Sequence, residues 1–123
     1  MKGVMPQEIE VWYILPALRK EFSKLMLNQG LRQREIAKKL YITEAAVSQY
    51  LKGKRGGNLI FSEEIRQEIT DSLSRLMQTG NIVQEFQFLC KKIRESEMLC
   101  QIHRKYGLAP PECNHGIICL EAR

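Results

Sequence analysis

Residues 33–51 read QREIAKKLYITEAAVSQYL, and this stretch decides the fold class that the sequence predicts. Its apolar residues recur at helical spacing, and Ala37 is small enough to lie where two helices cross closely. Thr43 is a suitable N-cap for a second helix, and Gly53 is a suitable residue just beyond its end. The stretch therefore predicts two short helices around a tight turn. The side chains expected to face inward are Ile36, Leu40, Ile42, Val47, Tyr50 and Leu51.

If those side chains face inward, the opposite face of the second helix presents residues that suit a DNA major groove. Gln49 can form two hydrogen bonds with an adenine, Ser48 can bond several bases, and Ala45 suits a thymine methyl group. Lys52 suits a guanine or a phosphate, and the run KGKRGG at 52–57 lets the backbone approach a sugar–phosphate chain. The alternative is an amphipathic helical hairpin that only packs in a core. The expected DNA-binding residues are Gln33, Arg34, Thr43, Glu44, Ala45, Ser48, Gln49, Lys52, Lys54 and Arg55.

The positive charge of the chain gathers in the same part of the sequence. The 123 residues have a formal net charge of +5, and residues 31–57 contain seven basic and two acidic side chains. Residues 58–123 contain eight basic and nine acidic side chains, so they contribute no positive excess. A clustered excess is what a polyanion-binding surface requires, because each neutralised phosphate releases condensed counterions.

The remainder of the chain predicts further helices, so the expected fold class is all-α. Helical periodicity, Pro16 at a helix start, Ser62 as an N-cap and Gly80 as a stop indicate where they lie. The expected helices span residues 17–28, 62–80, 81–95 and 98–106. The β-prone run Val11–Leu15 precedes them as an extended arm, a strand or part of a dimer contact. The buried stripes expected in the later helices are Ile65, Ile69, Leu73, Leu76, Ile82, Phe86, Leu89 and Ile93.

The chain resembles the XRE-type, lambda-repressor-like helix-turn-helix family, and more narrowly small archaeal regulators with a C-terminal cysteine cluster. The resemblance covers roughly residues 9–78 and is most specific from Ile42 to Gly56. The family usually has Gly where this chain has Tyr41, so Tyr41 must adopt a left-handed conformation or the turn is altered. The matching stretches are LPALR at 15–19, IAKKL at 36–40, ITEAAVSQYL at 42–51 and GKRG at 53–56.

The resemblance implies a sequence-specific transcriptional regulator in two parts. Residues 1–80 would form the helix-turn-helix DNA-binding domain, and residues 81–123 a cysteine-cluster segment that senses metal or redox state. Because one recognition helix reads only a few base pairs, we expect a homodimer on a palindromic double-stranded operator. An alternative is an antitoxin-like interaction protein that uses the same helices.

The four cysteines lie together in the last 34 residues, at Cys90, Cys100, Cys113 and Cys119. Clustered cysteines in a protein that we expect in the cytoplasm indicate metal or redox chemistry before structural disulfides. We favour an iron–sulfur cluster of the [4Fe-4S] type that modulates operator binding. Structural zinc is an alternative, with His103 as a further ligand because it follows Cys100 at ligand spacing. A reversible disulfide switch, or no bound species, also fits the spacing.

Other function classes find little support in the sequence. The chain has no CxxC pair, phosphate-binding glycine loop or recognisable Ser/His/Asp arrangement, so we do not expect an enzyme. Its apolar runs are too short for a membrane span, and its N-terminus lacks the features of a signal peptide. We therefore expect a cytoplasmic protein without a membrane partner.

Overall fold

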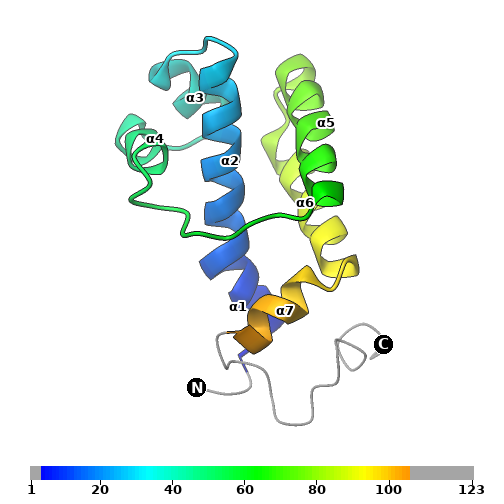
Figure 1. Ribbon diagram of the computed structural model, residues 1–123. Coiled ribbons are helices and arrows are strands. Elements are labelled where there is room, and N and C mark those ends of the chain that lie inside the picture. Colours follow the sequence, from blue (N-terminus) through cyan, green and yellow to red (C-terminus); the bar gives the residue numbers. More distant parts are fainter. Residues whose placement is uncertain (1–3, 106–123) are drawn as a thin grey trace.

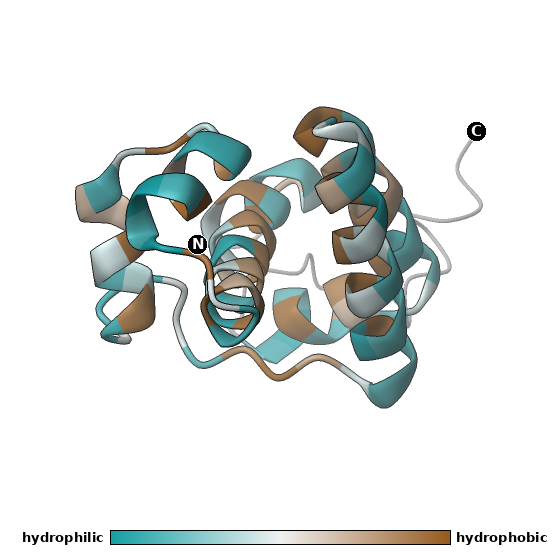
Figure 2. Ribbon diagram, turned by 90° about the horizontal axis from the view of Figure 1, so that it is seen from above, coloured by the Kyte–Doolittle hydropathy of each residue, from teal (hydrophilic) through white to brown (hydrophobic). Residues whose placement is uncertain are grey.

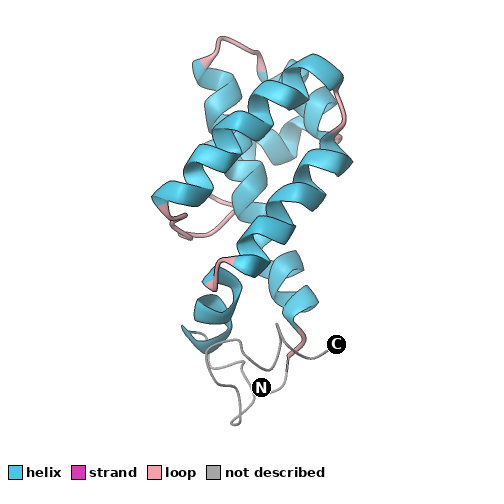
Figure 3. Cartoon of the chain, turned by 90° about the vertical axis from the view of Figure 1, so that its right-hand side faces the viewer, coloured by secondary structure: helices cyan, strands magenta, loops and turns pink. Residues whose placement is uncertain are grey.

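The structure is a computed structural model that describes residues 4–105, and the regular structure of this part is helical throughout (Figure 3). This confirms the all-α prediction. Expectations for residues 106–123, including those for Cys113 and Cys119, lie outside the described residues. The elements are α1 (Pro6–Ile9), the π-helical turn η1 (Glu10–Ile14), α2 (Leu15–Asn28), α3 (Gln33–Leu40), α4 (Glu44–Leu51), α5 (Glu63–Thr79), α6 (Ile82–Glu95) and α7 (Met98–Lys105).

The run Val11–Leu15 is helical, so the expectation of a strand or an extended arm is wrong. It forms the last four residues of η1 and the first residue of α2. Helix α2 begins two residues before the helix that the sequence predicts. Ile9 and Ile14 are five residues apart and both fully buried. A π-helical turn places residues five apart near the same face, whereas an α-helix would point them in different directions. Burial of these two side chains therefore overrides the β propensity of the run.

Helix α2 lies between two pairs of helices, with α3 and α4 on one side and α5 and α6 on the other (Figures 1 and 2). In Figure 2 many of the hydrophobic residues, drawn in brown, lie on the sides of the helices that face one another. Helix α7 packs against α1 and α6 at the lower end in Figure 1. No helix among residues 4–105 combines the length and the apolar character that a membrane crossing requires.

The hairpin of α5 and α6 follows the predicted pattern closely. The Ser62 side-chain oxygen accepts a hydrogen bond of 3.3 Å from the Ile65 N–H, and Gly80 ends α5 with a φ of 72°. The predicted stripes of both helices are buried, as expected. The boundary expected at residue 80 falls at this turn, and one hydrophobic core includes residues from both sides of it.

A buried polar group fixes the register of α5 against α6. The Glu85 carboxylate is 5% exposed and accepts hydrogen bonds from the Ser72 hydroxyl at 2.6 Å and from Arg75 Nε at 3.1 Å. The Arg75 guanidinium also lies 5.0 Å from the centre of the Phe88 ring. Since a buried carboxylate is costly without partners, these contacts favour one alignment of the two helices.

Candidate nucleic-acid interface

The turn between α3 and α4 has the left-handed residue that the family resemblance required. Tyr41 has a φ of 55° and a ψ of 44°, and the Ile42 N–H donates to the Ala37 carbonyl at 3.0 Å. This is the hydrogen bond that closes a helix with a residue in the left-handed conformation. A tyrosine there costs about 1 kcal/mol relative to a right-handed residue. Its side chain is 75% exposed, so no neighbouring packing has to be disturbed.

Both ends of α4 are closed by local hydrogen bonds, as the sequence predicts. The Thr43 hydroxyl oxygen accepts from the Ala46 N–H at 3.0 Å. At the other end the Gly53 N–H donates to the Tyr50 carbonyl and the Lys54 N–H donates to the Gln49 carbonyl, at 3.1 and 2.8 Å. Gly53 has a φ of 75°, which a glycine adopts without strain. These contacts supply partners for backbone groups at both ends of the eight-residue helix, which have no partner within the helix itself.

Helices α3 and α4 pack against each other and against α2 through one apolar face. The side chains predicted to face inward are buried, apart from Ile42 and Leu51, which are half-buried. Ala37 is 6% exposed, in agreement with its expected place between the helices. The opposite face of α4 is therefore left to solvent.

Most of the residues expected to contact DNA lie on the exposed surface of this pair of helices and the following loop. Ser48 and Gln49 are half-buried and lie at the border between the inward and outward faces. The exposed members of the set are Gln33, Arg34, Thr43, Glu44, Ala45, Lys52, Lys54 and Arg55. The fold therefore gathers the predicted set on α3, α4 and the loop after α4.

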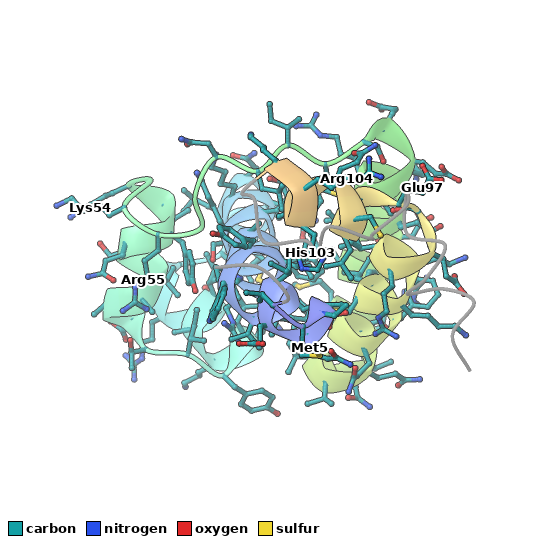
Figure 4. The ribbon with its side chains drawn as sticks, turned by 90° about the horizontal axis from the view of Figure 1, so that it is seen from below. Met5, Lys54, Arg55, Glu97, His103 and Arg104 are labelled. Atoms are coloured by element: carbon teal, nitrogen blue, oxygen red, sulfur yellow. The ribbon has the colours of Figure 1, made fainter. Side chains whose placement is uncertain are left out.

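The loop after α4 is attached to α2 at its glycines. Gly56 has a φ of 91°, and a Cβ there would lie 2.7 Å from the Lys20 Cβ, so a side chain has no room. The Lys20 ammonium donates to the Gly57 carbonyl at 2.8 Å. Since this end of the loop is held, Lys54 and Arg55 are confined to the surface beside α4, where Figure 4 shows them.

The exposed positive charge of the fold lies in the same residues where the sequence concentrates basic side chains. Of the seven basic side chains between residues 31 and 57, all are exposed except Lys39, which is half-buried. Helix α5 instead begins with the exposed carboxylates of Glu63 and Glu64. The positive charge is thus concentrated on α3, α4 and the loop, which is where a polyanion would be attracted.

Lys38 and Tyr41 belong to the same surface, although neither is among the residues predicted to contact DNA. They line a shallow depression of about 490 Å³ together with Arg34 and Glu44. Lys38 follows Arg34 by four residues, so the two cations share one face of α3. This four-residue spacing is the sequence signal that indicates Lys38, whereas the sequence indicates only a backbone conformation for Tyr41.

Of the four cysteines predicted to bind metal, Cys90 and Cys100 lie within the described residues. Cys90 on α6 and Cys100 on α7 are both buried, on helices that pack together. Among residues 4–105 no group of three or more potential ligands is close enough to hold a metal ion. Burial, together with the Glu10 carboxylate, raises the pKa of the Cys90 thiol from 9.0 to about 11, so this thiol is protonated at neutral pH.

His103, the alternative zinc ligand, is 2% exposed, and its Nε2 atom has no hydrogen-bond partner within the described residues. Figure 4 shows it in the interior, away from Lys54 and Arg55. An imidazole in this position packs as part of the α7 face that covers the core. The iron–sulfur and zinc hypotheses both depend on residues beyond 105, so both stay predictions.

We expect Ala37→Leu to destabilise the fold by about 1–3 kcal/mol, because Ala37 is 6% exposed between α3 and its neighbours and three more carbon atoms would overpack that contact. The same change should weaken DNA binding by moving α3 away from α4. Urea unfolding and fluorescence anisotropy with labelled duplex measure the two effects. Gln78→Leu adds a leucine at an exposed position of α5 and serves as the control. Wild-type stability of Ala37→Leu would show that the helices do not meet closely at this residue.

Comparison with models of protein families, with curated proteins and with solved structures finds no match for this chain.

Proposed function

We propose that this protein is a sequence-specific, double-stranded DNA-binding regulator of transcription in which α3 and α4 act as a helix-turn-helix. One observation carries the proposal. Helix α4 presents the exposed Ala45 on its solvent-facing side and the half-buried Ser48 hydroxyl and Gln49 amide at the border of that side. Exposed cations lie before and after it, on α3 and on residues 52–57. A helix of this character fits a major groove, while the cations fit the phosphates on either side.

The residues divide into two roles under this proposal. Ala45, Ser48 and Gln49 face the base edges, and the half-burial of Ser48 and Gln49 limits the rotamers that they lose on binding. Lys54 and Arg55 bind phosphates and fix the orientation of α4 without reading sequence. The first turn of α3, with Gln33 and Arg34, adds backbone N–H groups and a cation for a further phosphate.

Dimerisation belongs to the same proposal, because a single α4 covers only a few base pairs and two half-sites multiply the specificity. The exposed apolar side chains of Val11 and Trp12 on η1 are 58% and 49% exposed. They suit a contact between two copies, which is one of the alternatives that the sequence left for this run.

A metal-dependent response remains a separate hypothesis, since DNA binding by α3 and α4 does not require the cysteines. Spectroscopy and metal analysis of anaerobically purified full-length protein test it. An iron–sulfur cluster predicts visible absorbance with iron and sulfide in the sample, whereas structural zinc predicts zinc without visible absorbance.

Base readout by Gln49 is tested on a duplex that the wild-type chain has selected from a random pool. We expect Gln49→Ala to lose about 1–3 kcal/mol of discrimination between this duplex and single-base variants at the contacted position. Ser48→Ala should lose discrimination at a neighbouring position. The control is Gln87→Ala on α6, an exposed amide on another helix. If Gln49→Ala discriminates between all variants as the wild type does, Gln49 does not read a base.

A further inference from the structure

A hollow of about 370 Å³ lies where the turn between α3 and α4 comes close to α2 and α6. Its volume falls within the range of small-molecule sites. Most of its wall is apolar, and the apolar side chains are Leu15, Leu40, Ile42, Ile82, Val83 and Phe86. No residue of α4 contributes to it, and it shares only Tyr41 and Ile42 with the depression beside Lys38, so a ligand here would leave α4 free to meet DNA.

Arg19 is a cation of the wall that has no ion-pair partner among residues 4–105. Glu10 at the rim is paired with Arg94, with 2.9 Å between Oε1 and Nε. Arg19 also lines the hollow and is half-buried, yet no carboxylate of residues 4–105 lies within 4 Å of its guanidinium. A half-buried guanidinium beside an apolar surface is stabilised by an anion that forms two parallel hydrogen bonds with it.

We propose that this hollow binds a small carboxylic acid with an apolar body, as its carboxylate ion. Arg19 would hold the carboxylate, and the apolar wall would cover the hydrocarbon part. A monoanion fits better than a phosphate, because among residues 4–105 Arg19 is the one cation of the wall with no carboxylate within 4 Å, and it balances a single negative charge.

The position of the hollow gives such a ligand a route to the DNA-binding helices. Leu40, Tyr41 and Ile42 belong to the α3–α4 turn, and Val83 and Phe86 belong to α6 on the other side. Helices α3 and α4 pack mainly on α2, so the turn is held to α6 by few contacts of its own. A ligand that contacts both sides favours one position of the turn over others and thereby changes the presentation of α4. This regulatory part rests on the proposed DNA-binding function, whereas the binding site does not.

Isothermal titration calorimetry of the full chain with naphthalene-1-carboxylate tests the site, with naphthalene-1-carboxamide as a neutral probe of the same shape. We expect the carboxylate to bind about tenfold more tightly than the amide. Arg19→Gln should remove this preference, and Lys24→Gln, an exposed cation on the same helix, should retain it. Equal affinities of the two probes for the wild type, or a preference that survives Arg19→Gln, would overturn the proposal.

Variants of Val83 keep the test decisive if Arg19→Gln disturbs the fold. Val83 is 66% exposed at the edge of the hollow, so a charged side chain is tolerated there. Val83→Glu should weaken binding of the carboxylate and Val83→Lys should strengthen it, with the amide affected little by either. The same response of both probes to both variants would place the bound carboxylate elsewhere.

The regulatory part is measured separately, as the duplex affinity of the wild type with and without saturating naphthalene-1-carboxylate. A change of about fivefold or more supports it. Unchanged duplex affinity with calorimetric binding intact would overturn the regulatory role and leave the site standing. A chain that binds the probe but no DNA would instead refute the proposed function.

Discussion

The double charge reversal Lys54→Glu, Arg55→Glu should lower the affinity for every duplex on the order of 100-fold and flatten the dependence of affinity on salt. Both side chains are exposed on a loop that Lys20 and Gly56 hold against α2, so they can meet phosphates without further ordering. Each lost phosphate contact should reduce the slope of log K against log salt by about 0.9. Fluorescence anisotropy over a salt series measures both quantities.

The matched control for this prediction is Lys91→Glu, Arg104→Glu, which makes the same change in net charge on α6 and α7. It should alter affinity far less, because these residues lie away from α4 and act only through screened long-range attraction. Equal losses for the two double variants would mean that net charge, and not the loop, determines binding.

The second large effect is expected from Phe22→Ala, which should destabilise the protein by about 3–5 kcal/mol. Phe22 is fully buried, and its ring meets that of Phe86 edge to face, with 5.1 Å between the ring centres. This pair joins α2 to α6, so its loss leaves a cavity between the two sides of the molecule. Urea unfolding followed by circular dichroism measures the change in free energy.

Leu27→Ala on the same helix is the control, because Leu27 is 45% exposed and its truncation opens no cavity. It should change the unfolding free energy by less than about 1 kcal/mol. A Phe22→Ala variant as stable as Leu27→Ala would show that α2 and α6 do not stabilise each other through this contact.

Local signals in the sequence predict α4 and α5 well, because these helices have their own start and stop residues. Thr43, Ser62 and Gly80 act through hydrogen bonds or backbone conformations within a few residues, so a reader of the sequence can place them. The run Val11–Leu15 does not form the predicted strand or extended arm, because its conformation depends on the burial of Ile9 and Ile14 against helices that come later in the chain.

The α4 surface and the hollow beside Arg19 also differ in how far the sequence predicts them. Residues on α4 are close in sequence, and the helical repeat alone places them on one face. The hollow beside Arg19 brings together residues 10 to 90, and no spacing in the sequence indicates that these segments meet. Leu40, Ile42, Ile82 and Phe86 of its wall are predicted only as buried residues, because periodicity cannot tell a packed face from one that lines a cavity.

The central claim is that α4 reads DNA sequence, and selection from a pool of random duplexes by the full-length chain tests it most directly. The proposal predicts that repeated rounds enrich a palindromic motif, and that Gln49→Ala carried through the same rounds enriches a motif altered at specific positions. Recovery of an unenriched pool, or of the same motif by the wild type and by Gln49→Ala together with Ser48→Ala, would contradict it.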